Sequence, residues 1–193
     1  MYGATGAGKT HTMLGNPENP GLTFRTVMDL YQRLNEEREK ETLDCELAVS
    51  YVEVYNETVI DLINPGQQLA LREDGKLGVN MPGLSIHRPD SAEALLKFLQ
   101  FGNSNRTQHP TDANAESSRS HAVFQVYLKQ QGRASGLSAD VKCSKISMID
   151  LAGSERASVA HSRGGSRLRE GANINKSLLA LGKNEDAFCA PPV

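Results

Sequence analysis

The chain is 193 residues long, which is enough for one domain with a buried core. With 38% hydrophobic residues, 23% charged residues, no Trp and a net charge of −2, the composition excludes collagen-like, mucin-like and wholly disordered proteins and gives no reason to expect nucleic acid as a partner. The apolar runs are too short to span a membrane, and the amino end lacks the basic and apolar parts of a signal peptide, so we expect neither.

A glycine-rich phosphate-binding loop is the first predicted element. It follows the pattern G-x-x-x-x-G-K-[ST] and comprises Gly3, Ala4, Thr5, Gly6, Ala7, Gly8, Lys9 and Thr10. Glycines allow the backbone N–H groups to wrap a phosphate, Lys9 supplies a charge for the β and γ oxygens, and the Thr10 hydroxyl can bind Mg²⁺. The alternative is a chance glycine-rich turn, because the strand that normally precedes this motif would lie before Met1.

Helices and strands alternate along the rest of the chain. Periodicity predicts a helix over 26–41 and another that begins at Asp90-Ser91. Strands are expected at 47–55, 59–63, 122–128 and 142–149, with a pair of short strands between 69 and 87. This order predicts a layered α/β domain. The cysteines at 45, 143 and 189 show no CxxC spacing, which argues against a disulfide framework or a zinc site and favours a reducing compartment.

A dense polar cluster, residues 114–121, lies between the second helix and the next strand. Its hydroxyls could hold Mg²⁺ and orient a water molecule, and Arg119 could stabilise negative charge that develops on a γ-phosphate. Taken alone, a serine-rich surface loop is the better interpretation.

An acidic residue, Asp150, ends the last apolar strand, and Gly153 follows three residues later. A carboxylate in this place can hold Mg²⁺ through water, and a glycine N–H can contact the γ-phosphate. If Arg119 pairs with Glu155, the two segments form a latch that closes over bound phosphate. The argument depends on the chain order of loop, hydroxyl-rich cluster and strand-Asp-x-x-Gly.

Together these motifs resemble the motor domain of a kinesin. The resemblance covers residues 2–182 and rests first on the phosphate loop with His11-Thr12-Met13 and on the strand at 50–57. In addition, residues 117–121 are similar to switch I, residues 150–155 to switch II, and residues 170–178 to the start of the switch II helix. The segments 71–74 and 105–112, with Ala7, are most similar to kinesin family eight, plus-end-directed motors that regulate microtubule length.

The resemblance implies roles for individual residues. The loop 3–10 would bind the phosphates of ATP, with Lys9 on the β and γ oxygens. Ser117 would position the attacking water, and Arg119 would pair with Glu155. Mg²⁺ would be held by Thr10 and Ser118, with Asp150 in contact through water and Gly153 on the γ-phosphate; Asn114 completes the implied nucleotide contacts. His121 and His161 are expected to be polar loop residues rather than ligands.

The resemblance also implies microtubules as the partner. Residues 1–100 carry 9 basic and 15 acidic residues, whereas residues 101–193 carry 12 and 8. The basic residues expected to face acidic tubulin are Arg156, Arg163, Arg167, Arg169 and Lys176. The implied location is the cytoplasm, on microtubules that include those of the spindle, and the implied assembly is a homodimer through a stalk outside these residues.

The implied fold is a P-loop NTPase-like three-layer α/β sandwich with an incomplete central sheet. We expect residues 1–182 to be a partial motor domain and 183–193 to be a tail that departs from the family. Each large apolar side chain that lacks its neighbours forfeits about 1.5–3 kcal/mol, against a total of about 5–15 kcal/mol for a typical domain. We therefore expect a marginally folded chain with exposed sheet edges and impaired activity.

The sequence leaves two alternatives to the function of an ATP-dependent motor. A non-catalytic fragment would bind tubulin or a partner weakly, or do nothing, and nucleotide-dependent binding to microtubules separates it from a motor. A different P-loop ATPase or GTPase is disfavoured because the chain has no N-K-x-D stretch and its switch motifs fit kinesin.

Overall fold

A computed structural model describes residues 3–16, 18–40, 43–66, 68–74, 78–106, 119–132 and 141–154, and Lys176. The helices are α1 (Lys9–Leu14), α2 (Leu22–Glu39) and α3 (Ala92–Arg106). The strands are β1 (Leu43–Tyr55), β2 (Thr58–Asp61), β3 (Gln68–Leu69), β4 (Arg72–Asp74), β5 (Gly78–Asn80), β6 (His121–Gly132) and β7 (Val141–Asp150). None of the helices in these ranges is long and apolar enough to cross a membrane.

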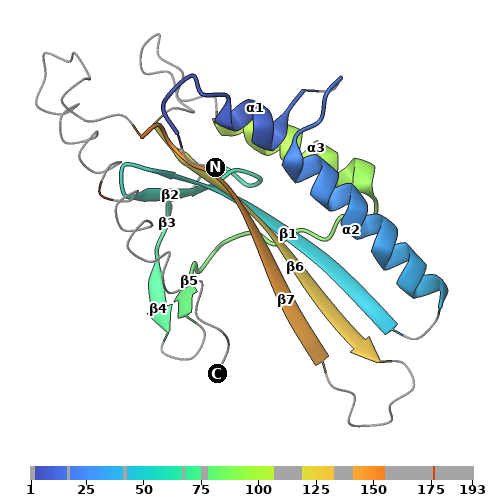
Figure 1. Cartoon of the computed structure of the whole chain (residues 1–193). Helices are drawn as coiled ribbons and strands as arrows, with labels where there is room; N and C mark the ends of the chain where they lie inside the picture. The colour runs from blue at the N-terminus through green and yellow to red at the C-terminus, as the bar shows by residue number, and fades with distance from the viewer. Residues whose placement is uncertain are drawn as a thin grey trace, which may run out of the picture.

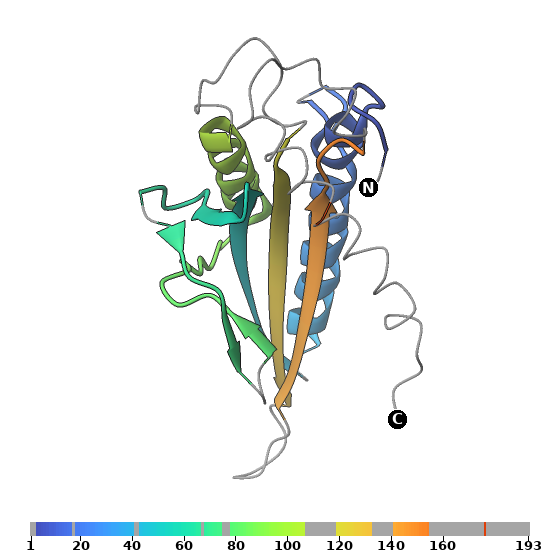
Figure 2. The same cartoon turned by 90° about the vertical axis from the view of Figure 1, so that its left-hand side faces the viewer.

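Five strands form one antiparallel sheet in the order β3-β2-β1-β6-β7, and β4 and β5 form a separate two-stranded ribbon. The three helices lie on one face of the larger sheet, with α1 and the glycine-rich loop at the end where β6 begins and β7 ends (Figure 1). The described residues thus supply the sheet and one helical layer of the expected α/β sandwich. Turned by 90°, the long strands β1, β6 and β7 lie side by side in front of α2 (Figure 2).

The core lies between the sheet and this helical layer. Along β1, the side chains of Cys45, Leu47, Val49 and Tyr51 are buried at every second position, which is the period of a strand that packs one face against helices. Tyr51 meets Phe124 of β6 edge to face, with ring centroids 5.5 Å apart. This pairing holds the centre of the sheet together.

A stripe of four residues on α3 is buried against the sheet: Leu95, Leu99, Gly102 and Arg106. The spacing of four, three and four residues places them on one helix face. A β-carbon on Gly102 would lie 2.4 Å from Cδ1 of Tyr51, so only glycine lets α3 approach β1 this closely. The last residue of the stripe is an arginine, which therefore enters the interior.

The strand β7 pairs on one side with β6, and it is one of the two outer strands of the described sheet, with β3 at the other edge. Residues 141–147 are exposed along its length, with Val141 47% and Ile146 41% exposed. Within the described residues, this strand is the exposed sheet edge that the sequence led us to expect.

Candidate functional site

The glycine-rich loop leads directly into α1. Gly6 and Gly8 both have φ of 80°, in the left-handed region that favours glycine, and Gly8 caps the amino end of the helix. The loop closes with a hydrogen bond from the Ala7 N–H to the Ala4 carbonyl at 3.2 Å. Successive turns of this kind form a concave backbone nest that binds anions.

Lys9 is buried, with 7% of its surface exposed, at the first position of α1. Its Nζ donates to the carbonyl oxygens of Gly3 and Ala4, both at 2.8 Å. The ammonium group therefore folds back over the loop instead of extending into solvent. This places a positive charge within the loop, where a phosphate would need one.

Thr10 joins the loop to the end of β7. Its hydroxyl donates to Oδ2 of Asp150 at 2.7 Å, across 140 residues of sequence. Asp150 is 3% exposed, and its Oδ1 has no hydrogen-bond partner among the described residues. A hydroxyl and a carboxylate in contact, with one carboxylate oxygen buried and available, make a hard-oxygen site of the kind that suits Mg²⁺ with its water molecules.

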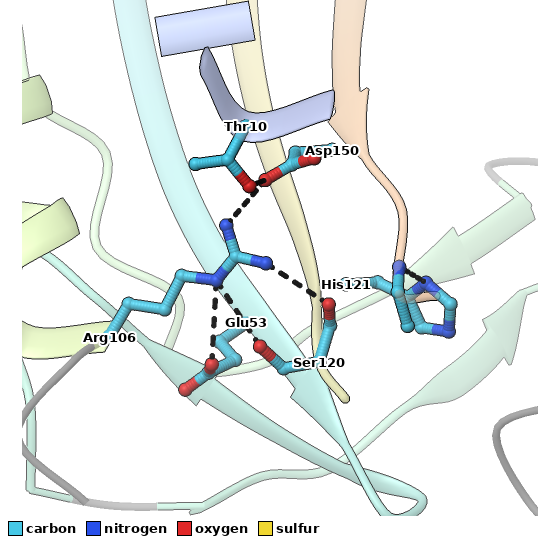
Figure 3. A network of polar contacts seen from close by, with 7 residues as sticks. Thr10, Glu53, Arg106, Ser120, His121 and Asp150 are labelled. Carbon is cyan, nitrogen blue, oxygen red and sulfur yellow. Dashed lines mark hydrogen bonds and ion pairs between the residues drawn. The ribbon is translucent and has the colours of Figure 1, made fainter. Parts of the chain in front are cut away.

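A buried arginine lies next to this pair. Arg106 is fully buried, and its Nη1 donates to Oδ2 of Asp150 at 2.7 Å. Its Nη2 donates to the Ser120 carbonyl at 3.0 Å, and its Nε donates to Oγ of Ser120 at 3.2 Å. Nε is also 3.8 Å from Oε1 of Glu53 on β1. Figure 3 shows the guanidinium group reaching from the end of α3 between these partners.

Two hydrogen bonds position the segment that follows Asp150. Nδ1 of His121 accepts the N–H of Ala152 at 3.0 Å, so its proton is on Nε2 when the ring is neutral (Figure 3). The N–H of Ser154 donates to the Gly3 carbonyl at 3.1 Å. Burial and the nearby charge of Arg106 lower the pKa of His121, which keeps the ring neutral as an acceptor. The segment 151–154 is thereby held against the loop.

Comparison with known proteins gives a single family. The family model described as "Kinesin motor domain" matches residues 1–188. The chain belongs to the kinesin motor-domain family. It is 61% identical to the kinesin-like protein KIF18B of Gallus gallus over 180 residues, which are 93% of this chain and 22% of that protein. It is 56% identical to KIF18A of Mus musculus over 181 residues, 94% of this chain and 20% of that protein.

A solved kinesin structure has the same fold. KIF14 residues 391–772, a dimer in the two-heads-bound state with AMP-PNP in complex with a microtubule, superposes with a TM-score of 0.81 at 37% identity, covering 100% of this chain and 56% of that chain. The resemblance to a kinesin of family eight and the expected α/β P-loop fold are confirmed. The chain spans about a fifth of the length of these curated relatives.

The structure brings together the kinesin phosphate loop, Asp150 and Gly153, which is buried in the segment held against the loop. Arg119 is half-buried and precedes Ser120. Four site residues lie outside the described residues: Asn114, Ser117, Ser118 and Glu155. The Arg119–Glu155 latch and His161 also lie outside them, as do Arg156, Arg163, Arg167 and Arg169; Lys176 is exposed.

One expectation was wrong. His121 is the first residue of β6 and is 8% exposed, so it is not a polar loop residue. Its ring is buried because it accepts the backbone N–H of Ala152, a partner 31 residues away that the sequence does not reveal.

Sequence reasoning also missed Arg106, Ser120 and Glu53. A signal for Arg106 was present, because it continues the buried spacing of Leu95, Leu99 and Gly102 on α3. Glu53 occupies an otherwise apolar strand, where a buried acidic residue requires a partner. Ser120 belongs to the polar cluster 114–121, but its pairing with Arg106 could not be predicted from the sequence.

Proposed function

We propose that this chain binds and hydrolyses ATP with Mg²⁺ and couples this cycle to microtubule binding and movement. The observation that carries the proposal is the contact between Thr10 and Asp150 at the amino end of α1, beside a loop that contains the buried Lys9. These are the groups that phosphates and a hard cation need at one place. Family membership and nucleotide-bound microtubule complexes of KIF14 support the same function.

The chain's own residues divide the work of phosphate and metal binding. The loop 3–8 binds phosphate oxygens through its backbone, and Lys9 turns from the Gly3 and Ala4 carbonyls to the β and γ oxygens. Thr10 would be a metal ligand, and Oδ1 of Asp150 would accept a hydrogen bond from water bound to the metal. The chemistry that a bound Mg²⁺ would supply here is neutralisation of charge on the transferred phosphate.

The switch residues carry the hydrolytic step in this proposal. Ser117 orients the attacking water, Ser118 is the second metal ligand, and Asn114 contacts the nucleotide. Gly153 donates its N–H to the γ-phosphate, and Arg119 pairs with Glu155 when the phosphate is present. Catalysis of phosphoryl transfer depends mainly on such positioning and on charge stabilisation.

Microtubules are the proposed partner. Acidic tubulin would be contacted by basic residues, namely Arg156, Arg163, Arg167, Arg169 and Lys176. We therefore propose that the protein is located on microtubules, including those of the spindle. We also propose homodimerisation through a stalk outside these residues. The family match extends to residue 188. The boundary of the motor segment at residue 182, with a divergent tail over 183–193, stays a prediction.

Substitution of Lys9 tests the phosphate site directly. Lys9→Ala removes the only charge that the structure places within the described loop, so we expect it to abolish retention of a fluorescent ADP analogue in the presence of Mg²⁺. Lys97→Ala, on the exposed surface of α3, is the matched control and should retain the analogue as the unsubstituted chain does. Equal retention by both variants would refute the assignment.

A further inference from the structure

The segment 151–154, which follows β7, is attached to the rest of the site at two points. The Ala152 N–H donates to Nδ1 of His121 at 3.0 Å, and the Ser154 N–H donates to the Gly3 carbonyl at 3.1 Å. The first bond, drawn in Figure 3, attaches the segment to the start of β6. The second attaches it to the glycine-rich loop. Two fixed points this close together restrict the orientation of the peptide groups between them.

The N–H of Gly153 lies between these two bonds. It is the middle one of three successive N–H groups, and the structure gives it no acceptor among the residues that it describes, although Gly153 is buried. Buried backbone donors ordinarily have an acceptor. A donor beside the phosphate loop that is left for an incoming oxygen suits the γ-phosphate of ATP.

His121 is well suited to hold the neighbouring N–H. The ring is 8% exposed, and burial and the charge of Arg106 lower its pKa more than the charge of Asp150 raises it. The imidazole is therefore neutral and keeps the lone pair on Nδ1 that the Ala152 N–H requires.

Loss of this acceptor would move the backbone. Ala152 is 0% exposed, so water cannot readily take the place of His121. A buried N–H without an acceptor is costly. The peptide group would turn toward another acceptor, and the next N–H along the chain, that of Gly153, would turn with it.

We propose that His121 is a positioning residue for recognition of the γ-phosphate: by holding the Ala152 N–H, it orients the N–H of Gly153 and so sets how strongly the site prefers ATP to ADP. The inference rests on the proposed function. ADP has no γ-phosphate, so its affinity reports the rest of the phosphate site separately.

The measurement is the dissociation constant of the 193-residue chain for a fluorescent nonhydrolysable ATP analogue and for the matching ADP analogue, both with Mg²⁺. His121→Leu removes the acceptor. The affinity for the ATP analogue should fall by about tenfold, as expected when one hydrogen bond to a charged group is lost. The affinity for the ADP analogue should stay within about twofold of that of the unsubstituted chain.

Two polar variants of His121 separate the acceptor from the bulk of the ring. His121→Asn carries its amide oxygen on Cγ, as histidine carries Nδ1, and should keep the ratio of the two dissociation constants within about twofold. His121→Gln carries its oxygen one bond further from the backbone and should lose the preference for the ATP analogue, as His121→Leu does.

The other outcomes contradict the inference. An unchanged affinity of His121→Leu for the ATP analogue would overturn it, and equal losses for both nucleotides would mean a general structural effect instead. If His121→Leu does not fold, the comparison of His121→Asn with His121→Gln decides, and equal ratios in these two variants overturn the inference. An unsubstituted chain that binds neither analogue would refute the proposed function, and the inference with it.

Discussion

Gly102 determines how closely α3 approaches the sheet, and Gly102→Ala tests this packing. In an open helix this substitution stabilises a protein by about 1 kcal/mol because alanine has the higher helix propensity. Here the new β-carbon would lie 2.4 Å from Cδ1 and 2.9 Å from Cε1 of Tyr51, far inside the ordinary contact distance of about 3.5–4.0 Å.

The Tyr51 ring cannot move aside without a cost. It is 2% exposed and packs edge to face on Phe124. Overpacking of this kind costs about 1–3 kcal/mol, so after the gain of about 1 kcal/mol in helix propensity we expect a net loss of up to about 2 kcal/mol in the free energy of unfolding. Because α3 ends at Arg106 four residues later, the displacement should also reach Asp150, at the proposed metal site.

Urea unfolding followed by circular dichroism measures this loss. Gln100→Ala, on the exposed side of the same helix, is the control and should change the free energy of unfolding by less than about 0.5 kcal/mol. In a Tyr51→Val background, which removes the clashing ring, Gly102→Ala should no longer destabilise. An increase in stability on Gly102→Ala in the unsubstituted background would refute the packing argument.

Two further predictions concern buried titratable groups. Burial and the charge of Arg106 lower the pKa of His121 below its unfolded value of about 6.5, so its stabilising contribution is present above that pH and is lost as pH falls. Between pH 7 and 5 the unsubstituted chain should therefore lose more unfolding free energy than His121→Gln. Equal losses in the two proteins would contradict this. Burial raises the pKa of Tyr51 to about 12, so the contribution of this residue to stability is present below pH 10 and is lost above it. The difference in absorbance between the unsubstituted chain and Tyr51→Phe should titrate near pH 12. A midpoint near pH 10 would contradict this.

Most of the elements could be predicted from the sequence because their periodicity reflects burial on one face. The expected strand at 47–55 began too late, since β1 starts at Leu43. Exposed Asp44 and Glu46 alternate there with buried Cys45, so the apolar run appeared to start at Leu47. Similarly, β6 extends beyond 128 to Gly132, where backbone pairing with β1 and β7 outweighs the polarity of Lys129 and Gln130.

Some residues of the site could be predicted from the sequence and others could not. The phosphate loop and Asp150 could be predicted because each belongs to a short motif with fixed spacing. The spacing on α3 signalled that Arg106 is buried, but its role could not be predicted, because its partners on β1, on β7 and just before β6 come within reach only in the folded chain. His121 was misassigned for the same reason, since its partner is a backbone N–H and leaves no trace in the sequence.

Co-sedimentation with microtubules tests the central claim most directly. The fraction of chain that pellets with microtubules is compared in a nonhydrolysable ATP analogue and in ADP, for the unsubstituted chain and for Lys9→Ala. The account predicts more pelleting with the ATP analogue than with ADP, and loss of this difference in Lys9→Ala. Equal pelleting of the unsubstituted chain in both nucleotides would contradict a nucleotide-coupled motor function and support non-catalytic binding.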